Sequence, residues 1–309
     1  MEEIVVSSSP FIHSKNDVNK LFLYIIMALL FPAIYGIILY GLGALFMIFV
    51  SVISCLAFEL LYNYFDKGKI FLKDLSCFVT GIIFALTLPF GTPYYVIIIS
   101  AFFATFVVKL AFGGLGRNSF NPALTARCLA GIMVPNMTST LYKITIAGDE
   151  YISLLEGGTN TLSNLFSGQA VGGIGTTCIM IFLAVYIVMA YMKIINIKIP
   201  IICLLSYLVV GILLDGFEMA TINLCSGSFI FVTIFMMTEP NTSPNTLMGE
   251  ILYSVMFGAL SALAWHYGFF GESCVFVVAL IINIFVPFMD RFLILKPATI
   301  GGYRHAHKN

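Results

Sequence analysis

The sequence predicts an all-α protein that crosses a lipid bilayer about ten times, and three observations support this fold class. Hydrophobic residues make up 60% of the 309 residues and charged residues only 10%, whereas soluble domains carry about 25% charged residues. The mean hydropathy is +1.01. Several apolar runs are long enough to cross a hydrocarbon core about 30 Å thick, and runs of that length favour helices over barrel strands.

Short polar or glycine-containing connections separate the apolar runs, and we interpret each run as one span. The predicted spans are 21–41, 44–63, 77–89, 93–112, 120–135, 176–194, 199–215, 226–238, 249–267 and 274–289. The third and eighth spans are shorter than the roughly 20 residues that a full crossing needs, and each leads into a proline. We therefore expect these two spans to be interrupted helices.

The distribution of basic residues predicts the orientation. Lysine and arginine follow the second, sixth and tenth spans, and with ten spans all three groups fall on the side of the N-terminus. Basic loops face the cytoplasm, so both termini are expected there. The predicted organisation is an N-terminal segment at 1–20, a first five-helix repeat at 21–135, an extracytoplasmic loop at 136–175, a second five-helix repeat at 176–289 and a cytoplasmic tail at 290–309.

Two matched features indicate an internal repeat. Residues 87–93 read TLPFGTP and residues 238–244 read TEPNTSP, and a Gly-x-x-Gly turn follows each of them, at 113–116 and 268–271. Because each copy holds an odd number of spans, the two copies must have opposite topology. Inverted repeats with paired interrupted helices place a binding site between the halves, near the bilayer midplane.

The segment from Phe112 to Arg127, FGGLGRNSFNPALTAR, contains the strongest candidate binding residues. Glycine allows positive φ, and Pro122 suits the first turn of a helix with Asn121 as its N-cap. Backbone groups freed here need a partner other than hydrocarbon. Gly114, Arg117, Asn118 and Asn121 could hold a phosphate or another polar ligand. The alternative is a tight loop at the water interface that only joins two spans.

Among the acidic residues, Glu239 is the candidate for an ion path, since it follows an interrupted span and could hold a cation or a proton. The alternative is a carboxylate that reaches cytoplasmic water. Glu59 is expected to snorkel from the end of the second span. No hydrolytic set or metal-ligand spacing is present, so no catalytic residue and no metal site are expected. The net charge of zero gives no indication of a nucleic-acid partner.

Five motifs carry a resemblance to a known family: SSSPFI, FGGLGRNSFNPALTAR, FSGQAVGGIGTT, MMTEPNTSP and FVPFMDR. Together they resemble the RnfD family, the D subunits of the Rnf electron-transfer complex, which is similar to the B subunits of the sodium-pumping NADH:quinone reductase. The resemblance covers about residue 5 to residue 300. It implies a ten-helix protein with two inverted five-helix repeats and a fold similar to urea transporters. It also implies a bacterial or archaeal plasma membrane location.

The same resemblance implies a function that this chain performs with partners. A complex of membrane and peripheral subunits would pass electrons between ferredoxin and NAD, coupled to Na⁺ or H⁺ export. This subunit would carry FMN, and a second, non-covalent flavin is left open. The family attaches FMN to a threonine in a Ser/Thr-Gly-Ala-Thr-Pro-Leu type of motif, which is absent here. Thr159 is the favoured substitute and Thr145 the other; a chain without covalent flavin is the alternative.

Two further function classes remain open on the sequence. An inverted repeat with interrupted helices would equally suit a channel or transporter for a small polar solute. A structural membrane subunit would follow if flavin were absent. A flavin absorption band in the purified protein would separate the redox function from both.

Overall fold

The computed structural model describes residues 18–67, 74–114, 116, 118, 120–134, 172–225, 228–269 and 273–293, and all regular structure in them is helical. The first half contains α1 (Val18–Tyr40), α2 (Leu42–Lys67), α3 (Ser76–Thr87), α4 (Tyr94–Phe102), η1 (Phe103–Leu110) and α5 (Pro122–Met133). The second half contains α9 (Ile179–Tyr191), α10 (Lys198–Asp215), α11 (Phe217–Cys225), α12 (Phe229–Phe231), η2 (Val232–Met236), α13 (Leu247–His266) and α14 (Cys274–Leu293).

Helix length and composition confirm a multi-pass membrane protein. Among the described residues, α1, α2, α10, α13 and α14 are long and apolar enough to cross a membrane, and the bent pair of α11 with α12–η2 is a sixth candidate. Shorter apolar helices occupy four further predicted spans. Helix α11 was not predicted from the sequence. The segment lies between the predicted spans 199–215 and 226–238, and Gly216, with φ of +82°, separates it from α10.

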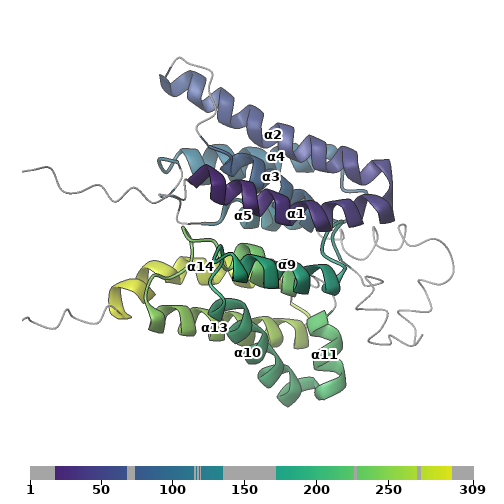
Figure 1. Ribbon diagram of the computed structural model, residues 1–309, viewed down its shortest axis with the longest axis vertical. Helices are drawn as coiled ribbons and strands as arrows, with labels where there is room; N and C mark the ends of the chain where they lie inside the picture. The colour runs from purple at the N-terminus through teal and green to yellow at the C-terminus, as the bar shows by residue number, and fades with distance from the viewer. Residues whose placement is uncertain are drawn as a thin grey trace, which may run out of the picture.

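The helices form two groups that correspond to the two halves of the chain (Figure 1). In the first group α2 packs against α3 and α4, and in the second α10 packs against α13. The latter contact is close because Gly258 has no side chain: a Cβ there would overlap Ser206 Oγ. The groups meet where α1 contacts α9 and where α5 contacts α14.

The first predicted interruption is confirmed, because α3 ends at Thr87, before Pro89. Its freed carbonyls find partners far along the chain. Arg127 Nε donates to the carbonyl of Thr87 at 3.0 Å, and the backbone N–H of Ile174 donates to the carbonyl of Leu88 at 2.8 Å. These bonds satisfy the two carbonyls, because the interior of a membrane supplies no water to do so. The guanidinium of Arg127 also lies 4.7 Å from the ring centre of Phe276 on α14.

The second predicted interruption is also confirmed, since η2 ends at Met236, before Pro240. Its freed carbonyl again receives a side chain from α5, because Asn121 Nδ2 donates to the carbonyl of Met236 at 3.5 Å. Asn121 stands at the start of α5 and Arg127 further along it. Side chains of α5 and of its N-cap therefore donate hydrogen bonds to both interrupted helices, one in each half of the chain.

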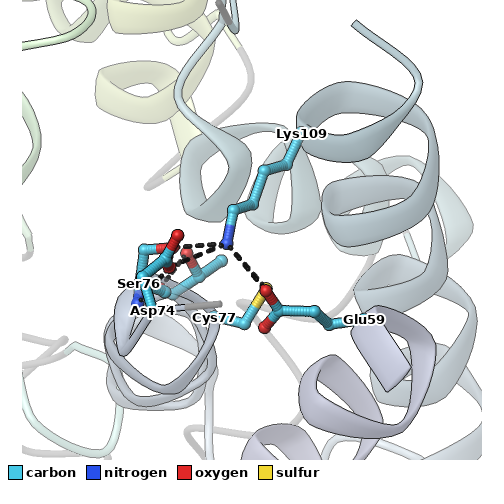
Figure 2. A network of polar contacts seen from close by, with 6 residues as sticks. Glu59, Asp74, Ser76, Cys77 and Lys109 are labelled. Carbon is cyan, nitrogen blue, oxygen red and sulfur yellow. Dashed lines mark hydrogen bonds and ion pairs between the residues drawn. The ribbon is translucent and has the colours of Figure 1, made fainter. Parts of the chain in front are cut away.

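A buried ion network ties α2, α3 and η1 together (Figure 2). Lys109 Nζ lies 3.7 Å from Glu59 Oε1 and 3.4 Å from Asp74 Oδ1, and it donates to Ser76 Oγ and to Cys77 Sγ. Glu59 is 1% exposed and Lys109 is 2% exposed. The expectation that Glu59 snorkels to water is therefore wrong, because a buried lysine from a helix distant in sequence neutralises it.

Asp74 precedes α3 and belongs to the same network. Burial by itself raises the pKa of its carboxyl, but Lys109 and the hydrogen bonds from Ser76 outweigh it, and the net pKa lies below the ordinary value. Asp74 is therefore the ionised partner that fixes the start of α3. We call Glu59, Asp74, Ser76, Cys77 and Lys109 the Lys109 network.

Replacing Lys109 with methionine should destabilise the fold by about 3–5 kcal/mol, because removal of one partner leaves buried carboxylates uncompensated. Thermal unfolding of the purified chain in detergent measures the effect. The matched control combines Lys109→Met with Glu59→Gln and Asp74→Asn, and it should recover most of the lost stability. If the Lys109→Met variant unfolds at the wild-type temperature, the structural role of the Lys109 network is contradicted.

Candidate functional site

A cavity of about 390 Å³ lies at the end of the molecule where α1, α3 and α5 begin. Its walls also include the residues that follow η2 and the residues at the end of α9. Most of the wall is apolar, including Phe22, Ile83 and Phe235. The polar residues that interrupt this wall are Ser76, Thr80, Asn121, Thr238, Glu239 and Asn241. An apolar pocket of this size with a few convergent polar groups is typical of a small-molecule site.

The glycine turn forms part of the cavity and has the conformation that the sequence predicts. Gly113, Gly114 and Gly116 all have positive φ, between +87° and +107°. The N–H of Gly114 donates back to the carbonyl of Lys109 and closes η1. Gly116 lines the cavity. Residues other than glycine adopt such φ values at an energetic cost. The backbone conformation therefore favours glycine here, and glycine adds no side chain to the wall.

The asparagine candidates lie at the start of α5. Asn121 is the N-cap, as predicted, since its side chain accepts from the N–H of Leu124 at 3.0 Å, and it lines the cavity. Asn118 is buried, and its Nδ2 donates to the carbonyl of Phe120. Its Oδ1 has no hydrogen-bond partner among the described residues. A buried acceptor of this kind requires a partner that the described chain does not supply.

Glu239 comes from the second half of the chain and lines the same cavity. Thr242 Oγ1 donates to its Oε2 at 3.3 Å. Desolvation raises the pKa of the Glu239 carboxyl to about 7, although Thr242 and the charge of Lys109 act in the opposite direction. The fold therefore brings an acid from one half to the same wall as the glycine turn and Asn121 from the other.

Three of the candidates lie outside the described residues, namely Arg117, Thr145 and Thr159. The structure therefore neither joins them to the cavity nor separates them from it.

The Lys109 network, whose Ser76 lines the cavity, was not predicted from the sequence. Lys109 stands four residues before Gly113, so its position at the end of a helix that leads into the glycine turn was the available signal. Its acidic and polar partners come from two other helices and the residues before them, and no spacing in the sequence connects them. The role of Arg127 as donor to an interrupted helix was missed for the same reason.

Comparisons with known proteins identify the family of this chain. Residues 5–301 match the model of the NQR2, RnfD, RnfE family. The D subunit of the Na⁺-translocating ferredoxin:NAD⁺ oxidoreductase complex of Acetobacterium woodii is 31% identical over 299 residues, which cover 94% of this chain and 93% of that protein.

Two more relatives have corresponding names. The D subunit of the proton-translocating ferredoxin:NAD⁺ oxidoreductase complex of Clostridium ljungdahlii is 28% identical over 325 residues, covering 97% of this chain and 96% of the relative. The D subunit of the ion-translocating oxidoreductase complex of Mannheimia succiniciproducens is 28% identical over 357 residues, covering 98% and 99%. The resemblance drawn from the five motifs is confirmed: the chain belongs to the NQR2, RnfD, RnfE family.

Proposed function

We propose that this chain is the flavin-carrying membrane subunit of an Rnf-type, ion-translocating ferredoxin:NAD⁺ oxidoreductase complex. The names of the relatives support membership of such a complex. The cavity carries the flavin part of the proposal, because Gly116, Asn121 and Glu239 line it together from distant parts of the chain. The chain acts with other membrane and peripheral subunits and performs no reaction alone. One relative is named for Na⁺ and another for protons, and the proposal covers either ion.

The residues of the cavity fit a flavin. Apolar side chains such as Phe22 and Phe235 suit a planar aromatic ring, and the volume lies within the range of small-molecule pockets, about 300–1,000 Å³. Asn121, Thr238 and Glu239 line the same cavity and offer polar groups to a ligand. A bound flavin supplies electron transfer. The chain's residues hold and orient it and keep water from it.

We place the cavity at the cytoplasmic end of the helices, which differs from the site near the bilayer midplane that the sequence predicted. The first turns of α1, α3 and α5 surround it, and the positive charge of the loops favours this end as the cytoplasmic one. The topology that agrees with this orientation has ten spans in two inverted repeats, with both termini in the cytoplasm of a bacterial or archaeal cell. The paired interruptions before Pro89 and Pro240, both served by α5, support the repeat.

We propose that FMN is attached covalently in the loop at 136–175, on the opposite side of the membrane, and that the flavin of the cavity is the second, non-covalent one. Thr159 is the favoured residue and Thr145 the second. Glu239 is proposed for the ion path, since a carboxyl that changes charge near neutral pH could take up a proton or a cation when the charge of the cavity changes.

Filling the cavity should remove non-covalent flavin. Ala123 is buried and lines the cavity, so Ala123→Phe should lower the flavin released by acid precipitation by at least about tenfold, the factor that corresponds to 1.4 kcal/mol. The matched control is Ala111→Phe at an exposed position outside the cavity. The absorbance of the released flavin, divided by the amount of protein, measures how much flavin each chain binds. A colourless wild-type protein that accelerates solute flux into liposomes would instead support a transporter.

Covalent attachment predicts an intact mass that exceeds the sequence mass by one FMN phosphoester. Thr159→Ala should abolish the excess mass, and Thr145→Ala should leave it unchanged. Mass spectrometry of the intact chain and of its peptides measures both. The opposite pattern would transfer the attachment to Thr145, and an unmodified wild-type chain would refute it at either residue.

The raised pKa of Glu239 should make the stability of the fold depend on pH. Its folded-state pKa of about 7 lies above the unfolded value of about 4.3, so the stabilisation is complete below about pH 4 and is lost as pH rises through about 7. The unfolding temperature of the wild type should therefore fall from about pH 5 to about pH 8 more than that of Glu239→Gln. Glu218→Gln, which alters an exposed acid on α11, is the control and should behave as the wild type. Equal slopes for all three would show that Glu239 does not titrate in this range.

A further inference from the structure

A second hollow lies between α1 and α9, apart from the polar groups of the candidate site. It is a groove of about 370 Å³ whose lining is apolar except for the hydroxyl of Tyr24. Phe31 of α1 and Ala184 and Val188 of α9 are among the lining residues, and all three are exposed. The groove therefore opens on the outer surface of the chain, between two apolar helices.

Lys193 lies between two groove-lining residues in the sequence and has an unusual backbone conformation. Helix α9 closes with two backbone hydrogen bonds, from Lys193 N to the carbonyl of Ala190 and from Ile194 N to the carbonyl of Met189. This closure places Lys193 at the left-handed position that glycine usually occupies, and its φ is +56°. Lys193 is exposed, and both of its neighbours, Met192 and Ile194, line the groove. A lysine thus occupies a strained backbone position directly between two residues of the groove wall.

We propose that this groove binds an anionic phospholipid, with an acyl chain along α1 and α9 and the phosphate at Lys193. An apolar groove with a lysine between two residues of its wall complements a molecule that has an apolar tail and a negative head. Basic pockets between membrane helices bind such head groups. The lipid also walls the candidate site, because Met189 and Ile194 line both the groove and the cavity.

The apolar lining of the groove suits an acyl chain, which is thinner than a helix with its side chains, about 10–12 Å across. Such a chain could follow the groove from Met192 toward Phe31. The charge of Lys193 adds specificity for an anionic head, since the apolar lining by itself does not distinguish between lipids.

The test adds phosphatidylglycerol or phosphatidylcholine to the delipidated, purified chain, and it measures bound lipid by native mass spectrometry and unfolding temperature by thermal denaturation. We expect the wild type to retain phosphatidylglycerol preferentially and to be stabilised by it. Lys193→Gly removes the charge and relieves the backbone strain, so it should fold at least as well as the wild type. Its affinity for phosphatidylglycerol should fall about fivefold, as one lysine near a membrane surface contributes about that factor.

A second variant tests the groove itself. Ala184→Trp fills it and should abolish retention of phosphatidylglycerol, whereas Leu183→Trp, at an exposed neighbouring position outside the groove, should not. Lys198→Gln, which removes another exposed lysine, controls for general attraction between charges. Equal retention of both lipids by the wild type, or unchanged selectivity in Lys193→Gly, would overturn the proposal. A photo-crosslinker at residue 184 that captures another protein of the assembled complex would overturn it in favour of a protein occupant.

Discussion

A bilayer offers no hydrogen bonds to the backbone, and this constraint governs how the chain can interrupt its helices. The carbonyls freed at the end of α3 are satisfied by Arg127 and by the backbone of Ile174. The carbonyl of Met236 is satisfied by Asn121. Each interruption therefore depends on contacts with segments distant in sequence, and the contact of Asn121 with Met236 joins the two groups of helices.

Helix α5 connects the interruptions to the candidate site. Asn121 caps its start, reaches the end of η2 and lines the cavity, while Arg127 reaches the end of α3 and stacks on Phe276 of α14. Pro122 and the preceding glycine turn fix where α5 begins. A ligand in the cavity would therefore contact a helix that already couples both halves of the chain. Movement of one group of helices against the other would change the shape of the cavity.

The buried charges show where sequence reasoning fails. Glu59 stands near the end of a long apolar helix, a position that favours snorkelling, yet it is buried beside Lys109. The pairing depends on how α2, α3 and η1 pack against one another, and the local sequence does not determine that packing. The same limitation applies to the apolar groove between α1 and α9, because each helix by itself is simply a membrane helix.

Local chemistry, in contrast, was predictable. Apolar runs determine which segments are helical, and Pro89 and Pro240 determine where two of them stop, because proline lacks the backbone donor that would continue a helix. The glycines require a turn, and Asn121 before Pro122 requires a helix start. Only the tertiary structure decided that the turn, the asparagine and Glu239 share one cavity. Their proximity is set by packing between helices more than a hundred residues apart, which covalent geometry and local propensity do not encode.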